Sequence, residues 1–274
     1  PDLLTQAPLN MLQAGFGDIL GKYTALADWE LGRVVNGEAY SAEVAAEVRR
    51  AVDEVLALSD DLNTPVMAER LMRALVISGE AMLAWGNSRP ASGAEHHLAH
   101  FWEMRAGLTG KTHHLHGIEV GVAVTYIAEL YHRVFSLNTK TVRNLIAARS
   151  VEPETDYQER INWAFGPLAR EVFDDLKGEY RDEAKRRSRQ EAILAKWDLL
   201  RERITPLVPS AEELRRLLQK HGASVAAEEL GFDHSELLLA LENAKEVRTR
   251  YTIFRLAEDI GIAPNGCAAT GNRE

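Results

Sequence analysis

The chain has 274 residues, a formal net charge of −9, a pI near 5.6, and 46% hydrophobic residues. This length and apolar content allow one large domain or two small ones, and the acidic balance excludes the basic face that nucleic acid or an anionic membrane surface requires. No run of about 18 apolar residues indicates a membrane span, and the single cysteine, Cys267, excludes a disulfide framework or a thiolate zinc site and fits a reducing, cytoplasmic location.

The first 150 residues are predicted to fold into helices separated by turn-forming residues. Ser41 is expected to cap one helix, and Pro65 begins another at a position where its missing N–H costs little. Glycine, proline and serine in 86–93 and glycine in 107–110 are typical of loops. Apolar residues at helical spacing predict helices over the ranges 42–58, 65–85, 94–106 and 116–137.

Beyond residue 150 the chain is richer in charge. Residues 157–204 are interpreted as one long amphipathic helix, and its densest basic stretch, 181–189, as a solvated helix face. Ser210 and Glu213 resemble a capping box that begins a shorter helix, and a final helix is expected over 235–260. The charges of this half are thus expected to solvate helices rather than to bind a partner.

Six of the nine histidines fall between residues 96 and 116. Residues 94–100 read Ala-Glu-His-His-Leu-Ala-His, and residues 111–117 read Lys-Thr-His-His-Leu-His-Gly. His96 and His100 share one face of a predicted helix, and neutral imidazole is the commonest protein ligand of a transition metal. A third imidazole from the next helix would complete a pocket, so the sequence predicts a metal site. Solvated rings at a helix end are the alternative.

The segment 15–21 reads Gly-Phe-Gly-Asp-Ile-Leu-Gly and offers Asp18 as a further ligand. It does not fit a dinucleotide fingerprint, because residues 9–14 read as helix rather than as a buried strand. The glycines are expected to permit a close backbone approach, with Asp18 at the mouth of the following helix, where the helix dipole would also favour it. One carboxylate and two imidazoles hold zinc, iron or nickel and leave open positions, which suits hydrolysis or alcohol oxidation.

No segment alternates apolar and polar residues strongly enough to indicate a strand, so the sequence predicts an all-α fold. Residues 1–262 are expected to form one helical metal- and substrate-binding domain. Within it, 1–150 would supply the metal-site helices and 151–262 the long amphipathic helices that pack on them. Residues 263–274, rich in glycine, alanine and asparagine, are expected to form a flexible tail.

The chain resembles the helical domain of bacterial sn-glycerol-1-phosphate dehydrogenases, members of the superfamily of iron-containing alcohol dehydrogenases, glycerol dehydrogenases and dehydroquinate synthases. Residues 14–23, 78–104, 115–121 and 244–253 carry the resemblance, which therefore extends over nearly the whole chain. It implies a C-terminal helical domain preceded by an α/β domain whose Gly-Gly-Gly loop holds NAD, and nothing in this sequence matches that loop. The chain is expected to be a C-terminal portion, inactive on its own.

The resemblance also implies roles for individual residues. The metal would be held by Asp18 of the Gly-Asp motif, by His96 as the first histidine after Gly-x-Glu, and by His116 of the His-Gly pair. Asp18 would also face the substrate. His100 would contact the substrate and orient a hydroxyl or assist proton return. His97 is the rival of His96, because more distant members of the superfamily space their two helix histidines by three.

Three further residues lie near these motifs. His113 and His114 are expected to lie in a loop, as donors to the metal ligands. Lys22, one helical turn after Asp18, would either meet a substrate phosphate or be an exposed lysine.

The resemblance implies a metal-dependent, NAD(P)-linked oxidoreductase that interconverts dihydroxyacetone phosphate and sn-glycerol 1-phosphate, a small phosphorylated polyol. The divalent metal would be zinc or nickel, with iron also accepted, and NAD(H) or NADP(H) would bind mainly to the missing domain. A homodimer through the helices after Tyr157 is expected. The alternatives are a related polyol or glycerol dehydrogenase of the same superfamily, or a non-catalytic helical metal-binding module whose protein ligands fill every coordination position.

Overall fold

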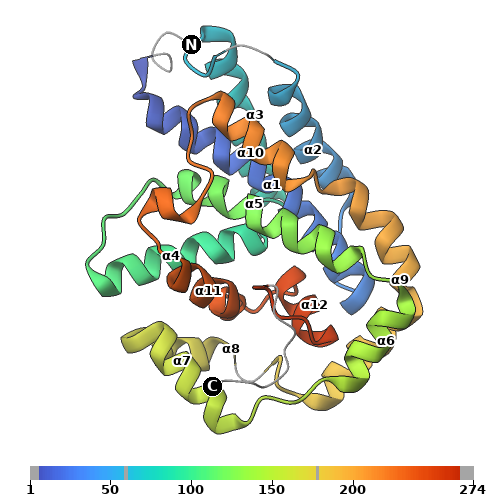
Figure 1. Ribbon diagram of the computed structural model, residues 1–274. Coiled ribbons are helices and arrows are strands. Elements are labelled where there is room, and N and C mark those ends of the chain that lie inside the picture. Colours follow the sequence, from blue (N-terminus) through green and yellow to red (C-terminus); the bar gives the residue numbers. More distant parts are fainter. Residues whose placement is uncertain (1–5, 59–60, 177–178, 266–274) are drawn as a thin grey trace.

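The computed structural model describes residues 6–58, 61–176 and 179–265. Every regular element in these ranges is a helix, so the predicted all-α class is confirmed (Figure 1). The α-helices are α1 (Leu9–Asn36), α2 (Ala42–Leu56), α3 (Pro65–Trp85), α4 (Ala94–Thr109), α5 (His116–Phe135), α6 (Thr139–Ala148), α7 (Glu154–Phe165), α8 (Ala169–Leu176), α9 (Glu183–Ile204), α10 (Ala211–Lys220), α11 (His234–Asn243) and α12 (Ile253–Ile260). Short 3-10 turns are η2 (Gly166–Leu168), η3 (Thr205–Leu207), η4 (Ala227–Leu230) and η5 (Ala244–Glu246).

Local capping chemistry begins several of these helices. Ser41 caps α2 and α3 begins at Pro65, both as predicted, and the hydroxyl oxygen of Thr64 caps α3. Ser210 caps α10 through its hydroxyl oxygen. A complete capping box is formed by Asp233 and Glu236 at the start of α11.

The prediction of one long helix over 157–204 is wrong, because the chain there is divided into α7, α8 and α9. Gly166 has a positive φ of 53° and precedes Pro167, which lacks an N–H, so the helical hydrogen-bond ladder cannot continue.

The helix expected over 235–260 is also interrupted, and residues 247–252 separate η5 from α12. A tertiary contact contributes to this break, because the backbone N–H of Ile253 donates to the carboxylate of Asp28 on α1 at 2.6 Å. This bond fixes the start of α12, in the manner of a cap supplied by another helix.

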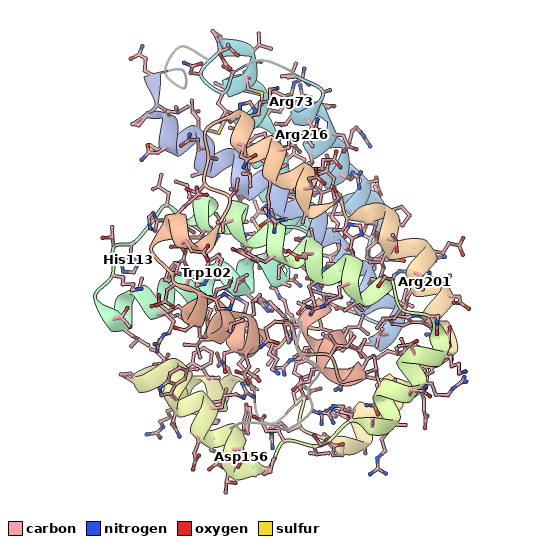
Figure 2. All side chains as sticks on the ribbon, viewed as in Figure 1. Arg73, Trp102, His113, Asp156, Arg201 and Arg216 are labelled. Atoms are coloured by element: carbon pink, nitrogen blue, oxygen red, sulfur yellow. The ribbon has the colours of Figure 1, made fainter. Side chains whose placement is uncertain are left out.

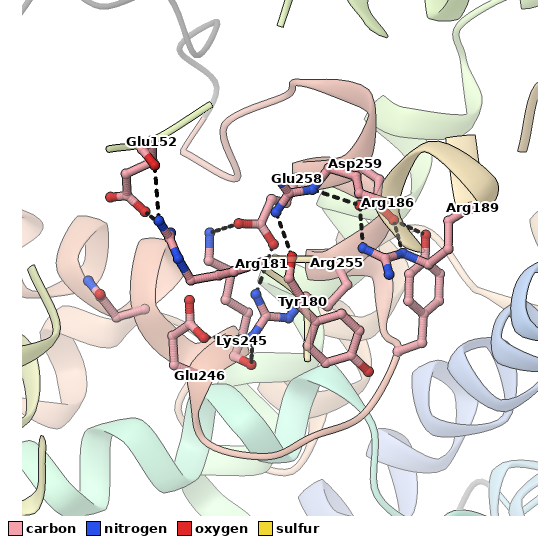
Figure 3. A network of polar contacts seen from close by, with 12 residues as sticks. Glu152, Tyr180, Arg181, Arg186, Arg189, Lys245, Glu246, Arg255, Glu258 and Asp259 are labelled. Carbon is pink, nitrogen blue, oxygen red and sulfur yellow. Dashed lines mark hydrogen bonds and ion pairs between the residues drawn. The ribbon is translucent and has the colours of Figure 1, made fainter. Parts of the chain in front are cut away.

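Two smaller expectations are also corrected. The helix expected over 94–106 continues to Thr109 and ends at Gly110, whose φ is +70°. In the basic stretch, Arg186 and Arg189 are buried, so its interpretation as a solvated face is wrong for these two residues. They contact the buried Asp259 of α12, because α9 packs against α12 (Figure 3).

The core is organised around α1 and α5, which form the most extensive helix pair and lie at the centre of the fold (Figure 1). The pair α2 and α3 packs on α1, and α4 packs on α5. No helix of the described ranges is long and apolar enough to cross a membrane. Of the expected flexible tail, residues 266–274 lie outside the described residues, while the backbone oxygens of Ala263 and Pro264 accept hydrogen bonds from Arg133.

Candidate metal centre

The candidate site lies where α1 and α5 approach each other so closely that only glycine fits between them. A Cβ atom on Gly17 would overlap the carbonyl oxygen of Gly117 and lie 3.0 Å from the Cα of Gly121. The close backbone approach expected of the glycines is thus confirmed. Because Asp18 follows Gly17 and His116 precedes Gly117, this contact brings the two side chains to the same place.

Asp18, His96 and His116 form one group. One possible ligand atom from each lies within 4.8 Å of the others. The Oδ1 of Asp18 is 3.3 Å from the Nε2 of His96, and the ring centroids of His96 and His116 are 5.2 Å apart. Three helices, α1, α4 and α5, therefore bring together the three residues to which the family resemblance points.

The position of Asp18 within its helix differs from the expectation. Because α1 begins at Leu9, Asp18 lies in its third turn and not at a helix mouth. The helix dipole therefore does not explain this carboxylate, since that effect is confined to the first turn.

Two glutamates hold the imidazole rings from behind. An oxygen of Glu95 lies 2.7 Å from the Nδ1 of His96, and an oxygen of Glu103 lies 2.7 Å from the Nδ1 of His116. Glu95 is fully buried and also accepts a hydrogen bond from the hydroxyl of Thr24 at 2.6 Å. A carboxylate on Nδ1 sets the tautomer and directs Nε2 towards a metal, as in many metal sites of proteins.

His100 adjoins this group on the side of His116. The two rings stack with centroids 4.9 Å apart, and Glu103 also accepts from the Nδ1 of His100 at 2.7 Å. His100, Glu103 and His116 form a second set of possible ligand atoms within 4.8 Å. Glu103 therefore links His116, a member of the first group, to the neighbouring His100 through one carboxylate.

The charges of the group favour an ionised Asp18. Burial would raise the pKa of Asp18, but Lys22 and His96 outweigh it and hold this pKa well below its usual range. Burial would lower the pKa of His96, but Asp18 and Glu95 raise it above its usual value. The two carboxylates therefore favour a proton on His96, and a bound cation would compete with that proton.

The same balance applies to Glu103. Burial would raise its pKa, but hydrogen bonds from His100 and His116 lower the pKa of Glu103 to about 2. The carboxylate is therefore ionised at neutral pH and remains an acceptor for both rings.

Lys22 is buried, so the alternative that it is an exposed lysine is wrong. Its side chain is 2% exposed, and Nζ lies 2.9 Å from Asp18 and donates to the carbonyl oxygen of Ala91 at 3.0 Å. Its ammonium group therefore orients the Asp18 carboxylate.

The remaining histidines of the cluster lie elsewhere. His97 is fully buried, contributes to neither group of possible ligands, and has no hydrogen bond to either ring nitrogen among the described residues. His113 and His114 lie in the loop before α5, as expected (Figure 2 labels His113). His114 contacts the carbonyl oxygen of Leu230 at 3.0 Å and not Asp18, His96 or His116.

Sequence reasoning missed Glu103 and Glu95. A signal for Glu103 was present, because positions 96, 100 and 103 follow the i, i+4, i+7 spacing of one helix face. Glu95 carried no such signal, since its carboxylate reaches the neighbouring His96 only through the local geometry of the first turn of α4.

Comparison with known proteins extends the similarity along the chain. No protein-family model matches. The chain is 31% identical to glycerol-1-phosphate dehydrogenase [NAD(P)+] of Bacillus licheniformis over 265 residues, which are 96% of this chain and 53% of that protein. It is 42% identical over 135 residues to the enzyme of that name from Bacillus subtilis, covering 48% of this chain and 34% of that protein. A relative from Halorubrum lacusprofundi, named likewise, is 28% identical over 272 residues, 98% of this chain and 55% of that protein. The resemblance to glycerol-1-phosphate dehydrogenases is confirmed, and the chain spans about half the length of the curated relatives it matches.

Proposed function

We propose that this chain supplies the metal- and substrate-binding half of an enzyme that interconverts dihydroxyacetone phosphate and sn-glycerol 1-phosphate with NAD(P)(H). The observation that carries the proposal is the convergence of Asp18, His96 and His116 in a chain similar to glycerol-1-phosphate dehydrogenases. The shared name of these relatives favours a phosphorylated polyol over glycerol as substrate, and it favours an enzyme over a non-catalytic metal-binding module.

The residues present fit a divalent cation. One carboxylate and two imidazoles suit zinc, nickel or iron, and three protein ligands leave positions for a substrate. The carboxylates on both Nδ1 atoms support this, because they orient the rings as ligands. A cation held by Asp18, His96 and His116 would supply positive charge that polarises a carbonyl oxygen and stabilises the negative charge developing there.

The other side chains of the site have separate tasks in this proposal. Lys22 keeps the Asp18 carboxylate aimed at the site. His100 is held at Nδ1 by Glu103, so its Nε2 is the atom that exchanges a proton with a substrate hydroxyl. His100 is therefore the proposed catalytic residue, and Asp18 also borders the substrate.

The dinucleotide is proposed to bind mainly outside this helical unit. The described residues form no strand, whereas the fold that cradles a dinucleotide pyrophosphate is built on a parallel sheet. This chain would then contribute the electrophile and the positioning of the substrate, and the cofactor the hydride. The expected homodimer stays a prediction, which light scattering of the purified chain tests.

Metal content of single variants tests the proposal. Elemental analysis after exposure to zinc or nickel is expected to give one cation per wild-type chain, and loss of that cation in Asp18→Ala, His96→Ala and His116→Ala. His97→Ala and the exposed His113→Ala serve as controls and are expected to retain it. Retention by His96→Ala together with loss by His97→Ala would reject the ligand set.

A further inference from the structure

A second polar cluster lies at the first turn of α4 and on two segments, 86–93 and 247–252, that carry none of the proposed metal ligands. It consists of Arg89, Arg248, Arg250 and His97, and is called the basic cluster. Arg250 donates to the hydroxyl of Ser88 at 2.9 Å and, through its other terminal nitrogen, to a backbone oxygen of the same loop at 3.2 Å. The loop 86–93 thus fixes one guanidinium directly before the helix that carries His96.

Several polar atoms of the basic cluster have no partner. The Nη1 of Arg89 is buried without a hydrogen bond, although the other nitrogens of this guanidinium bind Glu38 and backbone oxygens. Both ring nitrogens of His97, a fully buried residue, are likewise without a hydrogen bond among the described residues. Buried polar atoms without partners are rare in proteins, and such atoms often mark the place of a ligand.

Two carboxylates, Glu38 and Glu95, act on Arg250, but each already has other partners: Glu38 binds Arg89, and Glu95 accepts from Thr24 and contacts His96. Neither Arg248 nor Arg250 forms an ion pair within the described part of the chain. Burial, and then the charges of Arg89 and Arg248, lower the pKa of Arg250 to about 10. The charges of the same three arginines act on His97 as well. Three cations therefore gather here in a protein whose net charge is −9.

We propose that the basic cluster binds the phosphate monoester of the substrate, with Arg248 and Arg250 as its charged anchors. Guanidinium groups match the oxygens of phosphate in pairs, and the free nitrogens of Arg89 and His97 would find acceptors in the same anion. This inference rests on the proposed function, because it assigns the phosphate end of a substrate whose other end lies at Asp18, His96 and His116. The loop before α4 links the two clusters: the carbonyl oxygen of Ala91 accepts from Lys22, which contacts Asp18 at 2.9 Å, and the next carbonyl oxygen, of Ser92, accepts from Arg250.

Calorimetric titration of the 274-residue chain tests the assignment. Inorganic phosphate, sn-glycerol 1-phosphate, glycerol and NADH are titrated in turn, with and without zinc. Arg250→Gln is expected to weaken the binding of inorganic phosphate and of glycerol 1-phosphate about 10- to 100-fold, the effect of losing a hydrogen bond to a charged group. Glycerol binding is expected not to change.

Two further variants make the test independent of folding. Arg248→Gln removes an exposed side chain with no hydrogen bond or ion pair in the described residues, so it is expected to weaken both phosphates without lowering the melting temperature. Arg216→Gln is the matched control, because Arg216 is an exposed arginine on α10 (Figure 2). It is expected to bind both phosphates as the wild type does.

The outcomes separate this inference from the proposed function. Equal phosphate affinity in Arg250→Gln, Arg248→Gln and Arg216→Gln would overturn the basic cluster as an anion site, and intact zinc binding in the same proteins would leave the metal centre standing. Weakened NADH binding with unchanged glycerol 1-phosphate binding would overturn the assignment to the substrate and give the site to the pyrophosphate of the cofactor. Failure of the wild type to bind zinc would instead reject the proposed function.

Discussion

At the scale of single residues, the candidate metal centre depends on neighbours that set the charge of each ligand. Asp18 is ionised because Lys22 and His96 outweigh the effect of burial on its pKa. His96 and His116 are oriented by Glu95 and Glu103, which a list of ligands alone would omit. The site is therefore a network of charges already arranged before a cation binds.

One residue of α5 near this network titrates in an unusual range. Glu119 is fully buried, and neither carboxylate oxygen has a well-formed hydrogen bond, although the backbone N–H of His114 lies near enough to lower its pKa slightly. Burial and then the charge of Glu103 raise the pKa of Glu119 to about 8. The folded chain thus binds this proton more tightly than the unfolded chain does.

Glu119→Gln is expected to show this difference as a pH dependence of stability. Because the pKa of Glu119 is raised on folding, wild-type stability is expected to fall as the pH rises from the ordinary value of 4.5 to about 8. The variant lacks this loss, so its advantage in free energy of unfolding should grow by roughly 2–4 kcal/mol between pH 5 and pH 8.5. Urea unfolding at the two pH values, with chelator present, measures it. A constant difference would show that Glu119 titrates normally.

At the scale of elements, the site depends on the crossing of α1 and α5. Gly17, Gly117 and Gly121 allow the two backbones to touch, and the proposed ligands Asp18 and His116 are direct neighbours of two of these glycines. The spacing of the ligands is therefore set by backbone contact, which is stiffer than a contact between side chains.

Gly17→Ala is expected to destabilise the fold and to weaken the metal site together. Its new Cβ would overlap the backbone of α5, which cannot move without separating Asp18 from His116. A loss of about 1–3 kcal/mol in the free energy of unfolding is expected, the usual cost of overpacking, with weaker zinc binding in calorimetry.

Gly79→Ala is the matched control for this substitution. Gly79 lies within α3 and has open space at its Cβ position, so alanine should gain up to about 1 kcal/mol of helix propensity and leave zinc binding unchanged. If both variants bind zinc equally well, the crossing does not determine the ligand spacing.

At the scale of the whole molecule, buried ion pairs join helices that are distant in sequence (Figure 3). Arg255 of α12 contacts Glu246 of η5 at 2.6 Å and Glu258 at 2.8 Å. Glu246 also lies 3.4 Å from Arg160 of α7. This network holds η5 and α12 against α7, and with them the segment 247–252 that carries Arg248 and Arg250.

Glu246→Gln is expected to lower the free energy of unfolding by up to about 3–5 kcal/mol, the cost of breaking a buried ion pair, because Arg255 keeps only Glu258 and Arg160 only Glu152 as a carboxylate partner. Asp174→Asn removes one partner of an exposed pair on α8, whose side chains are 93% and 77% exposed, and should cost no more than about 1 kcal/mol. Thermal and urea unfolding compare the two variants. Similar losses of unfolding free energy in both variants would mean that the buried ion pairs stabilise the fold no more than an exposed pair does.

The elements that the sequence predicted well are those set by local chemistry. Ser41 and Thr64 cap α2 and α3, and apolar spacing located α5 almost to the residue. The broken helices after residue 150 were missed, in part because one break follows from the contact of Ile253 with Asp28, which are 225 residues apart in sequence. Periodicity cannot report such a contact.

By itself the sequence determined the all-α class and a cluster of possible ligands, because helix spacing and side-chain chemistry are properties of short segments, and its resemblance to a known family singled out Asp18, His96 and His116. Only the tertiary structure decided that these three meet, that Lys22 is buried against Asp18, and that His97 lies with the arginines outside both groups of possible ligands. Those facts depend on how closely α1, α4 and α5 pack, and burial and long-range charge exist only once the helices have come together.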